Sequence, residues 1–465
     1  MSPTVGSSDR PLRVAVVGSG PAAFFVVEHL LAHTELELSV DILERLPTPF
    51  GLVRFGVAPD HQKIKSVTRA FEKVAARPNV RFFGNVDVGR DVMLDDLRAH
   101  YDQICFATGA QTDRRLGIPG EDLARSHPAT EFVAWYNGHP DFRDLTFDLS
   151  VERVAIVGVG NVAVDVARIL CRTPEELART DIADYALEAL RESRVREVYM
   201  LGRRGPAQAA FTNPEVRELG EMPGADVTVP VDEAALDPLS LEMVEREKDR
   251  GTLKKIEILE EFAQRERTDK PRLLTLRFLV SPVEILDDGA GGVGGLKLVR
   301  NALRRDGDRL RPVATEEVET LPVQMVFRSV GYHGVPIADL PFHEKRGVVP
   351  NLAGRVEGND GAPVPGIYVA GWIKRGPTGV IGTNKSDAGE TVESMLADVA
   401  AGVVNRPPHP ESEAAAVLIS TQCPRRVSYE DWTRLDELEV GRGKAAGRPR
   451  VKFTSVEEML EALDR

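Results

Sequence analysis

Two stretches of the chain share one pattern of hydrophobic and polar positions. Residues 13–23 and 153–163 each begin with an arginine and an apolar run rich in β-branched residues, pass through a glycine-containing turn and continue as an alanine-containing segment. The apolar run predicts a buried strand, and the segment after the turn predicts a helix. The chain therefore contains a doubled strand–turn–helix unit, which is the only internal repeat in the sequence.

Glycines occupy both turns at the same spacing. Gly18 and Gly20 lie in the first turn, and Gly158 and Gly160 lie in the second. Such glycines allow a tight bend and let a pyrophosphate approach the N-terminus of the following helix. A third glycine-rich match, at residues 289–294, lies between two apolar runs with no helix after it, so we interpret it as a hairpin loop.

The strands that follow the two turns end in opposite charge. Leu38–Glu44 ends on a carboxylate, which can accept hydrogen bonds from ribose hydroxyls. Val198–Arg204 ends in two guanidinium groups, Arg203 and Arg204, which can bind a 2′-phosphate that a carboxylate would repel. The first site therefore suits FAD or NAD and the second suits NADP(H). An exposed strand-end charge and a solvated turn are the alternative interpretations, and the positions after the strands disfavour both.

This arrangement predicts an α/β fold with two Rossmann-like nucleotide-binding domains, the second inserted in the first. Residues 1–109 open the first domain, and the apolar run Gly366–Gly371 predicts a strand that rejoins its sheet, which extends this domain over residues 330–406. Residues 110–329 form the inserted domain. A proline-rich linker then introduces residues 407–465, a C-terminal extension that ends in a helix.

Composition narrows the class of protein. The chain has 465 residues, of which 42% are hydrophobic and 28% are charged, as in a soluble protein of two or three domains. The formal net charge of −13 argues against nucleic-acid binding. No apolar run approaches the ~20 residues of a membrane span, and residues 1–10 lack the apolar core of a signal peptide, so we expect a cytoplasmic location.

The three cysteines, Cys105, Cys171 and Cys423, are far apart in the sequence. Disulfide frameworks, zinc sites, bound iron–sulfur clusters and redox-active cysteine pairs all need closely spaced cysteines, so none of these is expected. Cys105 lies inside an apolar run, which predicts a buried, unreactive thiol. The sequence predicts no metal site.

Longer segments of the sequence resemble the ferredoxin-NADP reductases of adrenodoxin-reductase type, most closely the single-chain actinobacterial members. The resemblance extends from about Leu12 to Asp398 and is loose beyond the linker. The segments that carry it are Gly18–Ala23, Leu46–His61, Gly158–Asp165, Gly202–Pro206 and Gly371–Lys385. The resemblance implies a glutathione-reductase-like pair of domains, with FAD in the discontinuous domain and NADP(H) in the inserted one.

The glycine turns and the resemblance together select the candidate cofactor contacts. For FAD they are Gly18, Gly20, Ala22, Ala23, Glu44, Leu52, Asp87, Trp372, Gly379, Val380 and Ile381. For NADP(H) they are Val159, Gly160, Asn161, Val162, Arg203, Arg204, Glu215 and Gly379. The family often has Asn in place of Val159 and Ser in place of Ala22, so weaker contacts are expected there. Trp372 could fill a core, but the glycines beside it favour a place next to the flavin.

The resemblance also implies an activity. A hydride passes from NADPH to the flavin, and electrons leave singly for a ferredoxin-type iron–sulfur protein, which can in turn supply cytochrome P450s. His61 and Glu215 match family positions near the nicotinamide and the flavin, so both are candidate catalytic residues. His61 could relay a proton, since histidine titrates near neutrality, but a turn residue hydrogen-bonded to backbone is an equally good interpretation.

Ferredoxins are usually acidic, so a basic docking surface is expected. Lys63, Lys65, Arg69 and Lys73 recur at helical spacing and are the candidate docking residues. A solvated helix face explains them at least as well.

Other functions remain open at this point. An NADPH:quinone reductase or diaphorase would use the same two sites. So would an electron-feeding subunit resembling the small chain of glutamate synthase, although the few cysteines speak against its two clusters. A flavin-binding regulatory protein without turnover is a third class. Arg203 and Arg204 argue against it, because an inert binder has no need to select NADPH.

Overall fold

The computed structural model describes residues 4–307 and 309–465, which divide into two compact units. The first unit contains the described residues of Met1–Val57 together with His61–Thr112 and Tyr332–Arg465. The second contains Ala58–Asp60 and Asp113–Gly331. Which unit binds which nucleotide is not decided by this division and stays a prediction here.

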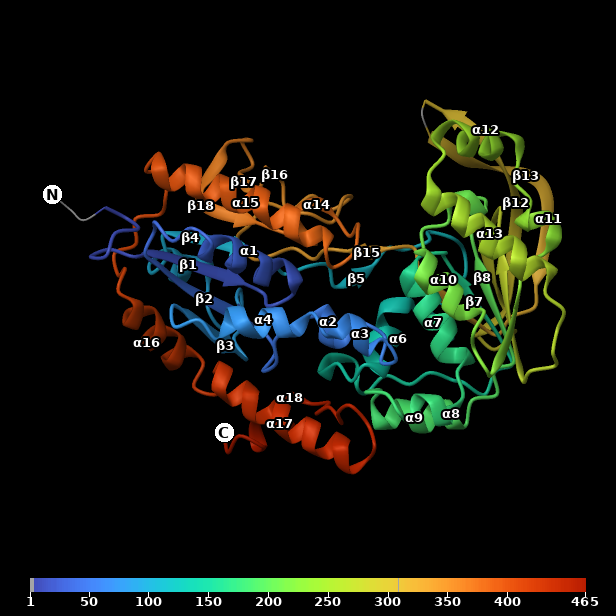
Figure 1. Ribbon diagram of the computed structural model, residues 1–465, viewed down its shortest axis with the longest axis horizontal. Helices are drawn as coiled ribbons and strands as arrows, with labels where there is room; N and C mark the ends of the chain where they lie inside the picture. The colour runs from blue at the N-terminus through green and yellow to red at the C-terminus, as the bar shows by residue number, and fades with distance from the viewer. Residues whose placement is uncertain (1–3, 308) are drawn as a thin grey trace. The chain divides into compact units, whose positions relative to one another are not determined.

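The first unit is built on a sheet with the strand order β16-β17-β18-β4-β1-β2-β3 (Figure 1). Its strands are β1 (Leu12–Val17), β2 (Leu38–Glu44), β3 (Val80–Gly84), β4 (Gln103–Phe106), β16 (Asn351–Leu352), β17 (Arg355–Glu357) and β18 (Pro363–Val369). The strands from β18 to β3 pair in parallel, and β17 pairs antiparallel with β18 at one edge. The late strand β18 joins this sheet beside β4, with Ile367 opposite Ile104.

Helices cover both faces of this sheet, which explains why its strands are apolar on both sides. One face packs against α1 (Pro21–Leu31), α4 (Thr68–Ala75), α15 (Thr383–Ala400), α17 (Tyr429–Ala445) and α18 (Val456–Glu461). The other packs against α5 (Leu94–Arg98) and α16 (Ser412–Gln422). The C-terminal helices α16, α17 and α18 therefore belong to the core of the first unit.

The remaining elements of the first unit are short, and two of them lie where the chain passes between the two units. They are α2 (Leu52–Phe55), α3 (Gln62–Lys65), α14 (Trp372–Arg375), β5 (Thr112–Asp113) and β15 (Tyr332–His333).

The second unit contains a parallel sheet with the strand order β6-β14-β7-β8-β10-β9. Its strands are β6 (Ser126–Pro128), β7 (Arg153–Val157), β8 (Glu197–Leu201), β9 (Ala225–Thr228), β10 (Arg272–Arg277) and β14 (Met325–Arg328). One face packs against α6 (Ala129–Tyr136), α7 (Asn161–Cys171), α9 (Asp184–Arg191), α10 (Asn213–Leu219) and α13 (Arg250–Gln264). Shorter helices are η1 (Pro140–Phe142), α8 (Pro174–Leu177), η2 (Pro206–Gln208), α11 (Val231–Ala234) and α12 (Pro238–Glu247).

An antiparallel sheet covers the other face of this parallel sheet. It consists of β11 (Val280–Asp287), β12 (Val293–Asp306) and β13 (Arg309–Leu321), and its leucines and isoleucine pack on β7, β8 and β14. The glycine-rich residues 289–294 fall at the connection between β11 and β12, which pair antiparallel. The interpretation of that motif as a hairpin loop is thus confirmed.

The three cysteines are buried and none forms a disulfide in the described part of the chain. Burial raises the pKa of Cys105 and of Cys171 to about 12, so both thiols stay protonated and unreactive near neutral pH. The buried position expected of Cys105 is confirmed. Across residues 4–307 and 309–465, the helices are all too short or too polar to cross a membrane.

Candidate nucleotide-binding sites

The first glycine of each turn lies against the end of a neighbouring strand. Gly18 has a φ of 101°, and a Cβ atom there would lie 2.7 Å from the carbonyl oxygen of Ala107. Gly158 has a φ of 133°, and a Cβ atom there would lie 2.1 Å from the carbonyl oxygen of Ser329. Each position requires glycine for two reasons. The positive φ is unfavourable for a residue with a side chain, and a Cβ atom would clash with the neighbouring carbonyl.

The second glycine of each turn has the opposite surroundings. A Cβ atom on Gly20 or on Gly160 would meet nothing within 4 Å. Each of these glycines is the N-cap of its helix, α1 or α7, and accepts the first helical hydrogen bond from Phe24 or Val164. The start of each helix is therefore approachable, as the binding of a pyrophosphate at a helix N-terminus requires.

Glu44, at the end of β2, is held beside the first glycine turn. Its Oε2 atom accepts hydrogen bonds from the backbone N–H of Ser19 (3.0 Å) and from the Ser19 hydroxyl (2.6 Å), and Oε1 accepts one from the Leu46 N–H (3.1 Å). Burial raises the pKa of Glu44, and the hydrogen bond from Ser19 opposes that shift. Glu44 is thus fixed at the turn by three hydrogen bonds, unlike a solvated strand-end charge.

The segment after β18 lies against the same turn. Gly371 has a φ of 76°, and a Cβ atom there would lie 2.5 Å from the Cβ of Ala22 at the start of α1. Its N–H donates to Asp387 Oδ2 (2.5 Å). The glycine at position 371 thus allows this segment to approach the start of α1 closely. The α14 helix then starts with Trp372, whose indole N–H donates to the Thr378 carbonyl (3.2 Å).

The remaining FAD candidates differ in their surroundings. Ala23 is fully buried in the core, whereas Leu52 is 37% exposed and Val380 is 55% exposed. Leu52 follows Gly51, where a Cβ atom would lie only 3.1 Å from the Cα of Gly20. Gly379 and Val380 are exposed, and Asp87 and Ile381 are half-buried. The structure therefore brings Glu44, Gly51 and Gly371 around the first turn and leaves the 379–381 loop accessible.

Arg203 and Arg204 follow β8 in the second unit. Arg203 is exposed and Arg204 is half-buried, and neither forms an ion pair with any described residue. Burial lowers the pKa of Arg204, and the charge of Arg203 lowers it further. Two adjacent guanidinium groups that repel each other and have no carboxylate partner fit a dianionic 2′-phosphate.

Comparison with known proteins decides the family. Residues 12–204 match the family model described as pyridine nucleotide-disulphide oxidoreductase. The chain is 46% identical to NADPH-ferredoxin reductase FprA of Mycobacterium tuberculosis, over 97% of this chain and 99% of that protein. It is 42% identical to the mitochondrial NADPH:adrenodoxin oxidoreductase of Homo sapiens, over 98% of this chain and 93% of that protein. The chain belongs to the ferredoxin-NADP reductases of adrenodoxin-reductase type.

The solved structures agree with this family. The structure described as Mycobacterium tuberculosis FprA in complex with NADPH matches with a TM-score of 0.91, at 46% identity, over 98% of this chain and all of that one. This match and the family model confirm the glutathione-reductase-like fold with two Rossmann-like domains. The resemblance inferred from the sequence is confirmed as well.

In this reductase, the second glycine turn is tied to the loop before α10. The Val159 carbonyl accepts hydrogen bonds from the N–H groups of Ala210 (2.9 Å) and Phe211 (3.1 Å). The Asn161 Oδ1 atom accepts one from the Thr212 N–H (2.9 Å). The side chain of Val162, the remaining candidate in this turn, packs on the hydrophobic core. Val159 is thus held through its carbonyl, whatever its side chain, and Asn161 and Val162 are held by their side chains.

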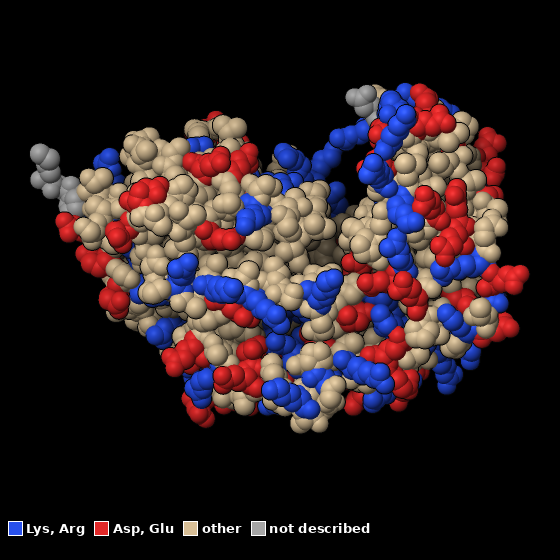
Figure 2. All heavy atoms as spheres, viewed as in Figure 1, with Lys and Arg blue, Asp and Glu red and all other residues tan. Residues whose placement is uncertain are grey.

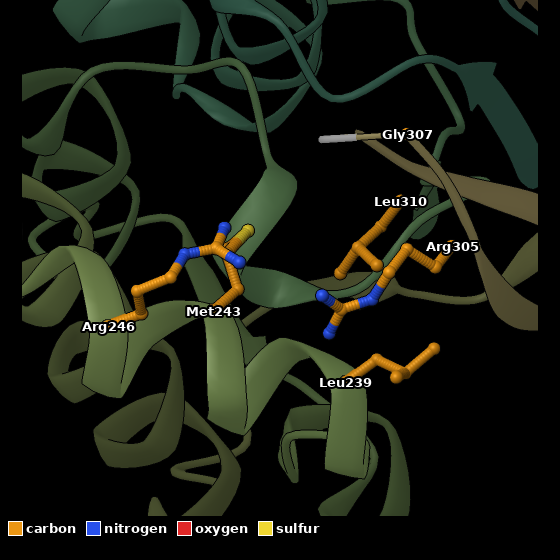
Figure 3. Close-up of a pocket in the computed structure, with 6 residues that line it drawn as sticks. All are labelled: Leu239, Met243, Arg246, Arg305, Gly307 and Leu310. Atoms are coloured by element: carbon orange, nitrogen blue, oxygen red, sulfur yellow. The ribbon is translucent and has the colours of Figure 1, made fainter.

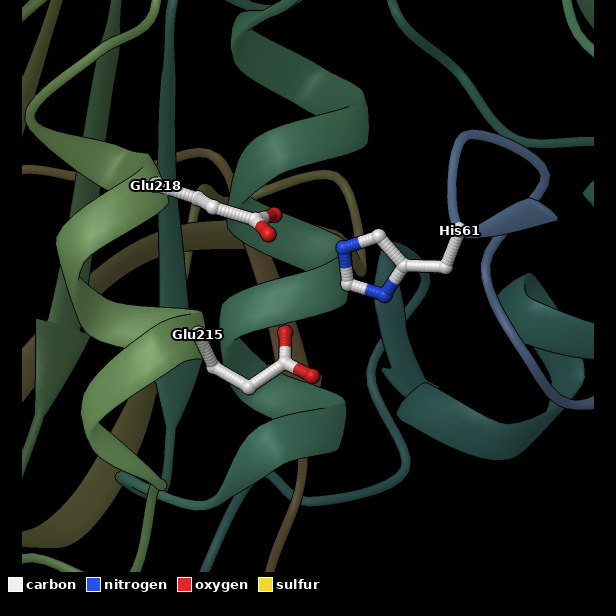
Figure 4. A group of neighbouring side chains, drawn as sticks. All are labelled: His61, Glu215 and Glu218. Atoms are coloured by element: carbon white, nitrogen blue, oxygen red, sulfur yellow. The ribbon is translucent and has the colours of Figure 1, made fainter. Parts of the chain in front are cut away.

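Glu215 and Glu218 project from one side of α10, as Figure 4 shows. The buried guanidinium of Arg168 lies 3.5 Å from Glu215 and 4.0 Å from Glu218, and it also pairs with Asp60 at 2.7 Å. Glu215 therefore lies in a charged network of the second unit. Its role toward a cofactor stays a prediction.

His61, also drawn in Figure 4, begins α3 in the first unit. It is 9% exposed, and its carbonyl accepts hydrogen bonds from the N–H groups of Ile64 (3.1 Å) and Lys65 (3.3 Å). The backbone of His61 thus caps the N-terminus of α3. Proton relay by its side chain stays a prediction.

Two residues that shape the first site were not selected from the sequence. Ser19 holds Glu44, and Asp387 holds the N–H of Gly371. Ser19 lies between the two glycines of the turn, so its position could have drawn attention to a polar contact with the next strand. No local pattern marks Asp387, since its contact depends on how α15 packs.

One hollow of the second unit lies apart from the glycine turn. It is lined by Leu239, Met243, Arg246, Arg305, Gly307 and Leu310, from α12 and the β12–β13 hairpin (Figure 3). Its cavity volume of about 10 Å³ is room for roughly one water molecule. It is too small to be a nucleotide site.

Proposed function

We propose that this protein takes a hydride from NADPH onto FAD and passes the electrons one at a time to a ferredoxin-type iron–sulfur protein. The observation that carries the proposal is the pair of glycine turns with opposite charge beside them. Glu44 is fixed at the first turn, and the unpaired Arg203 and Arg204 follow the strand beside the second. Bound FAD would supply both hydride acceptance and single-electron release.

We assign FAD to the first unit. The glycine turn and the N-terminus of α1 accept its pyrophosphate, and Glu44 accepts hydrogen bonds from its adenosine ribose. The family positions Leu52, Asp87, Trp372 and 379–381 would complete this site. Their support is the contact of Gly51 and Gly371 with the start of α1.

We assign NADP(H) to the second unit. The turn of Val159–Val162 receives the pyrophosphate, and the two guanidinium groups bind the 2′-phosphate. Gly379 and Glu215 are the remaining family positions expected to contact NADP(H), and Glu215 is expected near the nicotinamide. Hydride transfer depends on orientation, so these residues act by positioning, and His61 or Glu215 would hold or move a proton.

The deciding experiment is to purify the protein and measure its visible spectrum and its reduction of cytochrome c. Each assay uses NADPH or NADH, with and without a ferredoxin. A flavin spectrum, strong NADPH preference and turnover that requires ferredoxin are expected. Flavin reduction without any effect of ferredoxin would instead indicate a diaphorase. Slow flavin oxidation with no acceptor reduction would indicate a regulatory flavoprotein, and absence of a flavin spectrum would overturn the assignment of the first site.

The acidity of the partner and the place where it docks belong to the proposal. Lys63, Arg69 and Lys73 are exposed on α3 and α4 and form no ion pair with any described residue, whereas Lys65 is half-buried. Figure 2 shows basic side chains gathered over α4. An acidic ferredoxin would be attracted to this face, and the attraction would weaken with salt.

Charge reversal tests this docking surface. Arg69→Glu with Lys73→Glu is expected to lower ferredoxin-dependent kcat/KM roughly tenfold at low salt and to flatten its salt dependence. Ferricyanide reduction by NADPH, which needs no docking, should not change. Lys345→Glu with Arg346→Glu, another exposed pair in the first unit, changes the net charge equally and is the control. Equal losses in both double variants would show that overall charge, and not this face, controls association.

A further inference from the structure

The antiparallel sheet of the second unit contacts the turn that carries Arg203 and Arg204. Asn301, on β12, is 5% exposed. Its Nδ2 atom donates hydrogen bonds to the Arg203 carbonyl (2.9 Å) and to the Ser281 hydroxyl (2.8 Å). The first of these hydrogen bonds connects the backbone of the arginine turn to β12, although Arg203 and Asn301 lie 98 positions apart in the chain.

The backbone around Leu279 completes this connection. The Leu279 N–H donates to the Arg204 carbonyl (3.1 Å), and the Leu279 carbonyl accepts from the Asn301 N–H (2.7 Å). Leu279 has a φ of 58°, a left-handed conformation that a leucine adopts only when its surroundings impose it. The carbonyls of both arginines are thus held, one by the Asn301 side chain and one through the Leu279 N–H.

The pairing of β12 with β13 changes register beside Asn301. Val299 lies opposite Val318 and Asn301 lies opposite Ala314, so the extra residues are on β13. Asn301 is buried in alternation with Val299 and Leu303, whereas Ala302 between them is exposed. The ordinary alternation of a strand therefore turns the amide inward, where it meets the arginine turn.

We propose that Asn301 is a positioning residue for the choice of NADPH over NADH. The inference rests on the proposed function, because it concerns the same 2′-phosphate site. Two guanidinium groups bind one phosphate well only when both start from a fixed backbone, and their mutual repulsion favours moving apart. The hydrogen bond from Asn301 fixes the backbone of Arg203. The antiparallel sheet thus has a part in cofactor selection besides covering the parallel sheet.

The test compares Asn301→Leu with wild type. The probe is 2′,5′-ADP, whose dissociation constant is measured by calorimetry on the flavin-containing protein, together with the KM values for NADPH and NADH. Loss of the hydrogen bond is expected to raise the dissociation constant and the NADPH KM about five- to tenfold, with the NADH KM unchanged. Asn301→Ala should give the same pattern and provides a second variant if the leucine variant folds poorly.

Asn137→Leu is the matched control. Asn137 is a fully buried asparagine of the same unit whose Nδ2 donates to a backbone carbonyl, that of Val133 (3.1 Å). The control is expected to keep the ratio of the two KM values. Equal loss with NADPH and NADH in the Asn301 variants, or no loss, would overturn the positioning role alone. Wild-type protein that binds 2′,5′-ADP no tighter than 5′-AMP would overturn the proposed 2′-phosphate site together with this inference.

Discussion

With Arg203 and Arg204 both replaced by alanine, the KM for NADPH is expected to rise about 100-fold or more, while the KM for NADH stays within about threefold. A hydrogen bond to a charged group contributes about 1.5–3 kcal/mol, and two of them account for at least ~3 kcal/mol of binding to the 2′-phosphate. NADH has no such phosphate, so its binding does not use these side chains. Steady-state ferricyanide reduction with each nucleotide measures both constants.

Arg191→Ala with Arg194→Ala provides the control for this variant. Both arginines are exposed in the second unit and form no ion pair with a described residue, so the control removes the same charge elsewhere. It should leave both KM values near those of wild type. If NADPH and NADH lose affinity equally in the Arg203 and Arg204 variant, these arginines do not recognise the 2′-phosphate.

Glu439→Ala is expected to lower the stability of the first unit by about 3–5 kcal/mol. Glu439 is fully buried on α17, where it accepts hydrogen bonds from Arg54 Nη1 (2.9 Å), from Arg450 Nη1 (3.0 Å) and from the Phe453 N–H (2.9 Å). Its removal leaves guanidinium groups without their buried counter-ion. Arg54 belongs to α2, so the change also loosens the segment that carries Leu52, and weaker FAD retention is expected.

Thermal unfolding followed by circular dichroism and by flavin fluorescence measures both effects. The midpoint for Glu439→Ala is expected to fall by about 10 °C. Glu437→Ala, at an exposed position of the same helix, is the control and should unfold within about 2 °C of wild type. Similar midpoints for the two variants would show that the buried cluster contributes little.

The contribution of Glu439 to stability depends on pH, and the direction of its pKa shift determines how. Burial alone would raise the pKa of Glu439, but Arg54 and Arg450 outweigh that effect and lower it. A carboxyl whose folded pKa is lowered contributes stability above its unfolded pKa and loses that contribution as the pH falls toward the folded value. The difference between wild type and Glu439→Ala should therefore be constant from pH 6 to 8 and shrink only in acid, below about pH 4.

Local patterns predicted much of the fold because their causes are local. The turns at Gly18 and Gly158 follow from a strand, a conformation that only glycine adopts easily and a helix start, all within a few residues. The hairpin at residues 289–294 follows from apolar runs on either side of a glycine loop. The charges at Glu44 and Arg203 lie at or just beyond the ends of predicted strands, so their candidate roles could also be inferred without tertiary information.

Other parts of the structure depend on contacts between residues that are distant in the chain, and no local sequence pattern predicts these contacts. The ion pair between Arg54 and Glu439 joins residues 385 positions apart and connects α2 to α17. Apolar packing against the sheet adds α17 and α18 to the core of the first unit. Asn301 is an ordinary polar residue of a strand in the sequence, and only the packing of the antiparallel sheet beside β8 brings it to the arginine turn. The pattern of apolar and glycine positions in the sequence therefore determined the two strand–glycine–helix turns, whereas side-chain packing between distant segments decided what holds those turns in place.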